Sequence, residues 1–261
     1  MRLKDKIAII TGGASGIGKA ISDLFASEGA SVVLADKNGD AIPEAVESIK
    51  QAGGRASGSA VDVTQRDQLA EFMDKVVAQY GRIDILINNA GVSRYRPFAT
   101  TTSEDWDIVL DVDLKGVFFC TQAVAPHMVR QNYGRVVNIS SALGTGAAPH
   151  KTAGSPGGSA AYASAKAGVI MLTKTLAREL GPSGVTVNCI APGSFLTPFS
   201  ASTRTPEEVH EHMQHRKSTV VLGRLGTLQE LAAPVLFFAS DDSSYVTGHT
   251  LFVDGGRSDR M

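Results

Sequence analysis

The stretch IAIITGGASGIGKAISDLFASEGASVVLAD, residues 7–36, decides the fold of this chain. It begins with an apolar run, turns through glycines spaced G-x-x-x-G-x-G, continues with apolar residues at helical spacing, and ends in a second apolar run that stops at Asp36. A strand, a glycine turn, a helix and a second strand predict a parallel βαβ unit. Glycines let such a turn approach a pyrophosphate, and the following helix offers free N–H groups and the positive end of its dipole. The stretch therefore predicts a dinucleotide-binding unit, with a packing turn as the weaker alternative.

The rest of the chain repeats this alternation. Apolar runs typical of strands lie at 6–11, 31–35, 56–61, 83–87, 134–139, 185–190 and 250–253. Amphipathic stretches typical of helices lie at 16–28, 40–52, 65–80, 103–131 and 160–180. Four of the strand runs lack strict polar alternation, as expected of parallel strands that helices cover on both faces. The order predicts an α/β, Rossmann-type, doubly wound, seven-stranded parallel sheet with helices on both faces. No linker or internal repeat divides residues 1–261, so we expect a single domain.

Composition excludes several classes of protein. The 25 Lys and Arg residues nearly balance the 26 Asp and Glu residues, and the net charge of −1 comes without any block of like charge. A nucleic-acid-binding protein would carry a basic patch, so we expect no such partner. No apolar run approaches the ~20 residues that a membrane helix needs. Cys120 and Cys189 lie in apolar sequence and are expected to be buried free thiols, which suits a cytoplasmic protein.

Asp36 indicates which dinucleotide would bind. It stands at the end of the second predicted strand, where a carboxylate can accept hydrogen bonds from the adenosine ribose and would repel a 2′-phosphate. Gly13 offers no basic side chain to a phosphate, although the neighbouring Lys37 could tolerate one. The pattern therefore favours NAD over NADP. The alternative is that Asp36 only caps the helix expected at 40–52.

A second set of residues suggests proton transfer. Ser141 follows the strand expected at 134–139, and Tyr162 and Lys166 are four residues apart, so that they share one face of the helix expected at 160–180. A free tyrosine, with a pKa of ~10, is a poor base at neutral pH. A neighbouring ammonium favours the phenolate, which makes the tyrosine a usable acid and base. A serine hydroxyl at the strand end could hydrogen-bond a substrate oxygen.

The segment between Ser141 and Tyr162 is long and rich in glycine, proline and small residues. Its first task is to return the chain from the strand end to the helix. We leave open whether the remainder, around PHKTAGSPGG at 149–158, is a surface turn or part of the pocket rim.

Together these motifs resemble the short-chain dehydrogenase/reductase family, over essentially the whole chain. The resemblance rests on TGGASGIG at 11–18, NNAG at 88–91, Ser141 with Tyr162-x-x-x-Lys166, and PGSFLT at 192–197. It implies an NAD-dependent oxidoreductase, a short-chain alcohol dehydrogenase or ketone reductase, that moves a hydride between the nicotinamide and a secondary alcohol or ketone. In that reading Tyr162 is the acid and base, Ser141 holds the substrate oxygen, and Lys166 tunes Tyr162 and holds the nicotinamide ribose.

The same resemblance implies which residues contact the cofactor. They are Gly12, Ser15, Gly16, Ile17, Gly18, Asp36, Asp62, Val63, Asn89, Ala90, Gly91, Tyr162, Lys166, Pro192, Gly193, Phe195 and Thr197. It also implies a homotetramer. We expect one interface on the helix expected at 160–180 together with the apolar face of the 103–131 helix, which carries Val109, Val112 and Val117.

One position departs from the family pattern. Where the family has an asparagine in a proton relay, this chain has Asp113, in LDVDLKG at 110–116. The backbone carbonyl of Asp113 could still serve the relay, but its carboxylate is an additional charge that could pair with Lys166. We therefore count Asp113 among the candidate catalytic residues.

Residues 194–225 are expected to form a flap over the substrate. Phe195, Leu196 and Phe199 suggest an apolar wall there, which would suit a cyclic or aromatic substrate. His210, His212 and His215 lack the spacing of a zinc site, so we expect a solvated helix face and no metal.

Two other functions remain open from the sequence. A sugar-nucleotide-type epimerase or dehydratase also uses Tyr-x-x-x-Lys with NAD, but its glycine turn has a different spacing. A catalytically silent cofactor-sensing protein would keep the turn and lose the catalytic set, and Tyr162 and Lys166 argue against it.

Overall fold

The computed structural model describes residues 1–146, 159–195, 214 and 217–256 of the chain. Its strands form one parallel sheet, with seven strands in the described residues, in the order β3-β2-β1-β4-β5-β6-β7. The strands are β1 (Ile7–Thr11), β2 (Ser31–Asp36), β3 (Arg55–Ala60), β4 (Ile85–Asn88), β5 (Gly134–Ile139), β6 (Val185–Pro192) and β7 (Thr250–Val253). The order reverses between β1 and β4, where ligands of open α/β sheets bind. The predicted Rossmann-type fold is confirmed.

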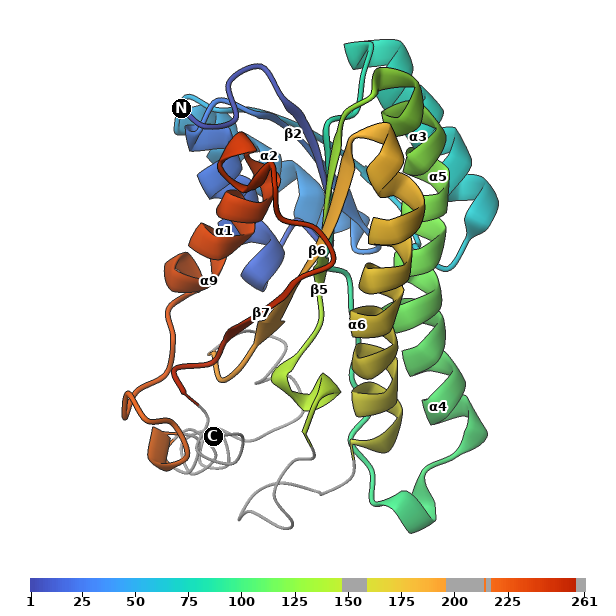
Figure 1. Cartoon of the computed structure of the whole chain (residues 1–261), viewed down its shortest axis with the longest axis vertical. Coiled ribbons are helices and arrows are strands. Elements are labelled where there is room, and N and C mark those ends of the chain that lie inside the picture. The colour runs from blue at the N-terminus through green and yellow to red at the C-terminus, as the bar shows by residue number, and fades with distance from the viewer. Residues whose placement is uncertain (147–158, 196–213, 215–216, 257–261) are drawn as a thin grey trace.

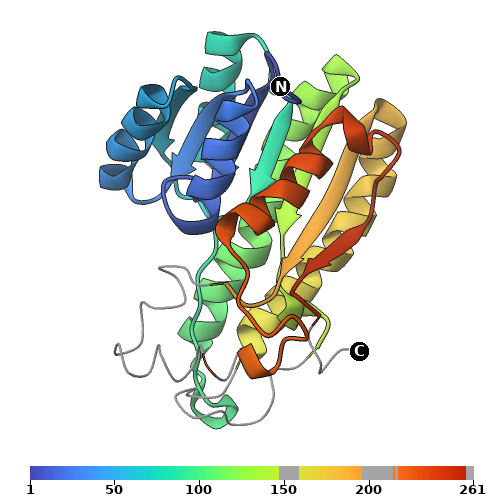
Figure 2. The ribbon, with the colours of Figure 1, turned by 90° about the vertical axis from the view of Figure 1, so that its left-hand side faces the viewer.

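Helices cover both faces of the sheet (Figure 1). One face carries α1 (Gly16–Ser27), α2 (Ile42–Gln51) and α9 (Leu228–Ala239). The other carries α3 (Arg66–Tyr80), α4 (Ser103–Leu110), α5 (Gly116–Gln131) and α6 (Ala160–Leu180). Short 3₁₀ turns lie at Gly39–Ala41, Phe98–Thr100, Ala142–Gly144, Gly181–Ser183 and Asp241–Ser243. Figure 2 looks onto the face that α1 and α9 cover.

The burial of β1 explains why its sequence shows no polar alternation. Ala8 and Ile10 pack with α1 and α9, whereas Ile7 and Ile9 pack with α3 and α5. Successive side chains of a strand point to opposite faces, and here both faces are covered, so every position is apolar. The strand was therefore recognisable as a continuous apolar run.

Two helical features differ from the sequence-based expectation. The helix expected at 103–131 is interrupted by a π-helical segment, Asp111–Lys115, between α4 and α5. Helix α9 was not predicted, and it packs against α1 on the sheet. Pro234 lies inside α9 and is a helix-breaking signal, yet Thr227 and Glu230 form a complete capping box at its start.

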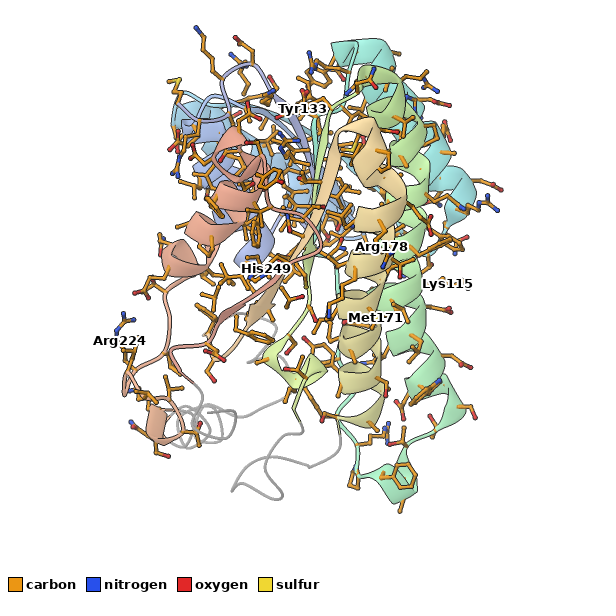
Figure 3. All side chains as sticks on the ribbon, viewed as in Figure 1. Lys115, Tyr133, Met171, Arg178, Arg224 and His249 are labelled. Atoms are coloured by element: carbon orange, nitrogen blue, oxygen red, sulfur yellow. The ribbon has the colours of Figure 1, made fainter. Side chains whose placement is uncertain are left out.

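The expected subunit interface was placed on the wrong residues. Val109 and Val117 are buried within the chain: Val109 lies in a cluster with Leu143 and Tyr162, and Val117 packs with Val169 and Cys189 of α6 and β6. Val112 is partly buried against the core. The large outward apolar side chains on these helices are Trp106, Phe118, Val129 and Met171, with exposed fractions of 41%, 39%, 38% and 60%. Met171 lies on the outer side of α6 (Figure 3).

The cysteines match the expectation. Both Cys120 and Cys189 are buried and unpaired. Burial raises the pKa of Cys120 to about 12 and that of Cys189 to about 11, so neither thiol is an available nucleophile at neutral pH. Among the helices in the described part of the chain, none has the length and apolar character required to cross a bilayer.

Candidate active site

The glycine turn after β1 leaves a space that side chains would fill. Gly12 and Gly16 have φ of +62° and +54°, which disfavour other residues. A Cβ on Gly18 would lie 2.0 Å from the carbonyl oxygen of Gly12. Helix α1 begins at Gly16, and the Ser15 side chain makes no capping hydrogen bond to its first N–H groups. Those N–H groups remain available to an anion, so the turn fits the pyrophosphate of a dinucleotide.

The Asp36 carboxylate lies against this turn. Its Oδ2 accepts a hydrogen bond from the Ala14 N–H at 3.1 Å, and its Oδ1 accepts one from the Asn38 N–H at 3.0 Å. Helix α2 begins at Ile42 and none of its N–H groups donates to Asp36, so the alternative of a simple helix cap is not supported.

Lys37, the cation next to Asp36, already forms a salt bridge. Lys37 Nζ lies 2.7 Å from Oδ2 of Asp62, and Oδ1 of the same carboxylate accepts hydrogen bonds from the backbone and side chain of Thr64. Burial opposes the charge on Asp62, but the hydrogen bonds from Lys37 and Thr64 outweigh it and hold the pKa of Asp62 below its usual value. A cation paired in this way is less available to a phosphate beside Asp36.

The two asparagines of NNAG have different partners. Asn89 Nδ2 donates to the carbonyl oxygens of Thr11 at 3.0 Å and Gly12 at 3.1 Å, which fastens the end of β4 to the glycine turn. Thr11 Oγ1 accepts the N–H groups of Asn89 and Ala90, both at 3.0 Å. Asn88 instead turns into the core, where its Nδ2 donates to Asn138 Oδ1 at 2.8 Å.

The remaining predicted cofactor residues border the same edge of the sheet. Val63 is buried beside Gly116, and Ile17 packs against the core at the start of α1. Gly193 follows Pro192 at the end of β6, and a Cβ there would lie 2.5 Å from Cβ of Asp254. Phe195 is 9% exposed and its segment pairs with Gly226. Thr197 lies outside the described residues.

The catalytic candidates meet at the carboxyl end of β5. Ser141 is the second residue after the strand, and its Oγ accepts the Leu143 N–H at 3.2 Å. Tyr162 and Lys166 lie in the first turns of α6, are buried, and are close together, with Lys166 Nζ 5.5 Å from the centre of the Tyr162 ring. The Tyr95 ring lies 6.0 Å from that of Tyr162. Tyr95 was not among the residues predicted from the sequence, although its place shortly after NNAG at the end of β4 was a usable signal.

Asp113 pairs with Lys166 in the fully buried interior. Its Oδ2 lies 3.1 Å from Lys166 Nζ, and its Oδ1 accepts the Val92 N–H at 2.7 Å. Lys166 Nζ also donates to the Ile139 carbonyl oxygen at 3.1 Å. Burial raises the pKa of Asp113, and the charge of Lys166 and the Val92 hydrogen bond oppose this only in part. A Cβ on Gly91 would lie 3.3 Å from Oδ2 of Asp113, so the NNAG segment passes directly over the pair.

Several sequence-based predictions fall partly or wholly on undescribed residues. These include most of the flap at 194–225, with Leu196, Phe199 and the three histidines, and residues 147–158 of the segment before Tyr162. Within residues 1–146, 159–195, 214 and 217–256, no group of three histidine, cysteine or acidic side chains could hold a metal ion.

The fold, the glycine turn and the Tyr162–Lys166 pair define a nicotinamide-dependent oxidoreductase of the Rossmann type. A family model described as enoyl-(acyl carrier protein) reductase matches residues 12–258. The chain belongs to the short-chain dehydrogenase/reductase family, which confirms the resemblance seen in the sequence.

Relatives and solved structures agree over nearly full length. The chain is 44% identical to the 3-oxoacyl-[acyl-carrier-protein] reductase FabG of Thermotoga maritima, over 98% of this chain and 99% of that protein. It is 40% identical to the (2S)-[(R)-hydroxy(phenyl)methyl]succinyl-CoA dehydrogenase subunit BbsD of Thauera aromatica, over 99% and 98%. The crystal structure of gox2181 superposes with a TM-score of 0.90 at 32% identity, covering 97% of this chain and 96% of that one. The crystal structure of a short-chain type dehydrogenase/reductase from Mycobacterium marinum superposes with a TM-score of 0.89 at 32% identity, covering 97% of this chain and 95% of that one.

Proposed function

We propose that this protein interconverts a secondary alcohol and a ketone with NAD as the hydride carrier and Tyr162 as the proton carrier. The observation that carries the proposal is the meeting of two sites at one edge of the sheet. The glycine cradle for a dinucleotide lies at the end of β1, and Ser141, Tyr162 and Lys166 lie around the end of β5. Parallel strands place both ends on the same side.

The bound nicotinamide supplies or accepts a hydride at the substrate carbon. In the reducing direction, Tyr162 gives its hydroxyl proton to the oxygen that becomes the alcohol, and in oxidation the phenolate takes that proton back. Lys166, 5.5 Å from the Tyr162 ring, favours the phenolate through its charge. The Ser141 hydroxyl hydrogen-bonds the same substrate oxygen and stabilises the charge that develops there.

NAD is proposed in preference to NADP because of the charges around the turn. The Asp36 carboxylate would accept hydrogen bonds from the ribose hydroxyls and would repel a 2′-phosphate, while Lys37 forms a salt bridge with Asp62. Gly13 cannot supply a compensating cation at the turn, and a Cβ there would lie 2.8 Å from the Ile10 carbonyl oxygen.

For the substrate we propose an acyl compound with its oxygen β to a carboxyl derivative. The relative from Thermotoga maritima is named for 3-oxoacyl groups on a carrier protein, and the relative from Thauera aromatica for a hydroxyl-bearing succinyl-CoA. The Tyr95 ring beside Tyr162 would give such a substrate an aromatic contact next to the reacting oxygen.

The proposal is tested by cofactor absorbance with purified protein. A panel should hold 3-oxoacyl and 3-hydroxyacyl thioesters, simple aliphatic ketones and alcohols, and cyclic or aromatic ones, each with NAD(H) and NADP(H). We expect stoichiometric oxidation or reduction of NAD(H) with at least one β-oxygenated acyl compound. Isomerised product without net change in the cofactor would instead indicate an epimerase. Cofactor binding without turnover of any substrate would indicate a sensing protein.

We also propose a cytoplasmic homotetramer, with the outer faces of α5 and α6 as one interface. Phe118 and Met171 expose large apolar surface there, in place of the buried valines first expected. Sedimentation should give a stable oligomer, and Met171→Glu should weaken it. An active monomer at assay concentration would contradict this assignment.

A further inference from the structure

The end of β5 holds α6 through three consecutive residues. Asn138 Nδ2 donates to Thr173 Oγ1 at 2.9 Å, the Ile139 carbonyl oxygen accepts Lys166 Nζ at 3.1 Å, and Ser140 Oγ donates to the Lys166 carbonyl oxygen at 2.7 Å. All of these contacts are buried, and Ser140 and Lys166 are each 3% exposed. Ile139 therefore binds the ammonium of Lys166, and the next residue, Ser140, binds its backbone carbonyl.

The two serines of the pair have separate environments. Ser141 Oγ accepts the Leu143 N–H at the start of a 3₁₀ turn. Ser140, the preceding residue, directs its hydroxyl to the backbone of α6, and its own N–H donates to the Ile190 carbonyl oxygen of β6 at 2.8 Å. Neighbouring residues of an extended chain point to opposite sides, so one serine can serve a substrate while the other serves the helix.

Gly144 brings the same stretch of α6 close to the chain after β5. A Cβ on Gly144 would lie 2.8 Å from the carbonyl carbon of Lys166 and 2.9 Å from its oxygen. The Lys166 backbone is therefore in contact with both Ser140 and Gly144. These two contacts fix where Lys166 lies along the chain that follows β5.

We propose that Ser140 is a positioning residue that sets how far the Lys166 ammonium lies from Tyr162. This inference rests on the proposed function, in which that ammonium favours the Tyr162 phenolate. Asp113 attracts the same ammonium, from 3.1 Å. By holding the lysine backbone, the Ser140 hydrogen bond limits that pull, so the ammonium stays 5.5 Å from the centre of the Tyr162 ring.

Among the described residues, three titratable side chains surround Lys166. Asp113 faces it from the π-helical segment, Tyr162 from its own helix, and Cys189 from β6. Tyr95 reaches Tyr162 from the segment after β4. Burial raises the pKa of Cys189 to about 11, so this thiol stays neutral where the enzyme is assayed. If Lys166 moves, the main effect is therefore on how strongly its charge favours the Tyr162 phenolate and the Asp113 carboxylate.

Ser140→Ala tests the inference. Without the hydrogen bond, the ammonium settles closer to Asp113 and farther from Tyr162, and Coulomb attraction to the phenolate weakens with that distance. We expect kcat for alcohol oxidation to fall about tenfold near neutral pH, the size of one lost buried hydrogen bond. The rising limb of the oxidation profile should move to higher pH. Ser140→Thr, which keeps the hydroxyl, should restore both kcat and the profile.

A matched control lies on the same helix. Thr175 Oγ1 also donates to a carbonyl of α6, that of Met171 at 3.2 Å, but it is exposed. Thr175→Ala removes the same kind of bond without touching Lys166, so its kcat and pH profile should equal those of the wild type. If Ser140→Ala does not fold, Ser140→Cys keeps the volume with a weaker donor and should show a smaller shift in the same direction.

A second readout needs no substrate. Ultraviolet titration of phenolate in Ser140→Ala, taken as the difference from the Ser140→Ala/Tyr162→Phe double variant, reports Tyr162 among the five tyrosines of the chain. We expect Tyr162 to lose its proton at higher pH in Ser140→Ala than in the wild type. A shifted titration with no turnover would refute the proposed substrates and keep this inference. An unshifted titration together with an unshifted pH profile in a folded variant would overturn it.

Discussion

Tyr133 and Ser141 lie just beyond the two ends of the same strand, β5, and the side chains around them are organised differently. At the amino end, the Tyr133 ring, labelled in Figure 3, has Lys6 Nζ 3.8 Å from its centre and the Arg135 guanidinium carbon at 4.3 Å. Its hydroxyl donates to Asp241 Oδ1 at 3.1 Å, and Arg135 reaches the same oxygen at 2.9 Å. At this end, opposite charges are bonded to one another.

The two tyrosines beside lysines make the difference plain. Burial is the main reason that the pKa of Tyr133 lies above its usual value, and Arg135 counteracts it only in part, while Asp241 favours the neutral phenol. Tyr162 has Lys166 beside its ring, and the nearby carboxylate of Asp113 faces the lysine. A cation near a tyrosine is therefore not enough for acid–base chemistry, because burial and a carboxylate bonded to the hydroxyl both favour the neutral phenol at Tyr133.

The start of a helix shows the same contrast. Helix α9 begins with Thr227 and Glu230 in a complete capping box, and Arg224 binds the same carboxylate. Helix α1 begins beside the glycine turn, and its Ser15 makes no such bond. The first N–H groups of α1 have no side-chain partner, and with the glycine turn beside them they suit the pyrophosphate of a dinucleotide.

The largest effect should come from removing the phenol at the functional end. Tyr162→Phe should lower kcat by about 10³-fold, the range of general acid–base catalysis, and leave NAD affinity nearly unchanged because the ring remains. Tyr133→Phe is the matched control and should keep kcat. Steady-state kinetics and cofactor titration measure both. If Tyr162→Phe retained most of its turnover, the assigned proton carrier would be wrong.

At the opposite end, Asp84 should matter for stability alone. It is fully buried, accepts the Ile7 N–H at 2.9 Å, and binds Arg82 Nε at 2.9 and 3.0 Å. Asp84→Ala should lower the free energy of unfolding by about 3 kcal/mol, since it leaves a backbone donor and a cation without their acceptor. Denaturant unfolding gives this value, and kcat per folded molecule should not change. A specific loss of kcat would mean that the two ends are not independent.

Asp36 should set cofactor choice without setting the fold. Asp36→Ala should weaken NAD about tenfold and narrow the preference over NADP, because ribose hydrogen bonds and phosphate repulsion are both lost. Asp62→Asn is an informative companion, since it would release Lys37 and improve NADP binding. Dissociation constants for both cofactors test this. Equal use of NAD and NADP by the wild type would refute the preference.

Asp113→Asn should shift a pH limb rather than abolish activity. Removing the carboxylate leaves the Lys166 charge less compensated, so that the Tyr162 phenolate is favoured more strongly. In ketone reduction the falling limb should then move to lower pH by about half a unit, opposite to the direction expected for Ser140→Ala. Because burial raises the pKa of Asp113, the two enzymes should converge at low pH, where the wild-type carboxyl is protonated. Identical profiles would show that only the backbone of Asp113 matters.

The smallest effect concerns the capped helix. Hydrogen bonds from Arg224 and from the Thr227 N–H lower the pKa of Glu230 to about 2 from an ordinary 4.5. A carboxyl whose pKa is lowered by folding stabilises the protein at pH values above its ordinary pKa. That stabilisation is lost as the pH falls from the ordinary pKa through the pKa in the folded protein. Glu230→Gln should therefore lower Tm slightly at neutral pH, and the difference from the wild type should vanish as pH falls from about 4.5 to 2. Scanning calorimetry across that range is the measurement, and a difference that persists at the acid end would contradict the assignment.

How much the sequence predicted follows from how local each signal is. All seven strands of the described residues were predicted to within a few residues. The signal was clearest for β1, β2, β4, β5 and β6, because strands buried on both faces are continuous apolar runs, whereas β3 is partly exposed. The spacing of Tyr162 and Lys166 predicted their shared face of α6. The π-helical segment and the burial of Val117 were not predictable, since they depend on how α5 and α6 meet in space. The separate roles of Ser140 and Ser141 were hidden for the same reason, because adjacent identical residues carry no signal of their partners.

Gly18 has a consequence for how this protein can change by mutation. Every amino-acid replacement that a single base change makes in a glycine codon introduces a Cβ. At Gly18 any Cβ would lie 2.0 Å from the Gly12 carbonyl oxygen, whichever residue arrives. No neutral first step away from glycine exists there. Descendants of this gene should therefore keep glycine at position 18 while other positions change.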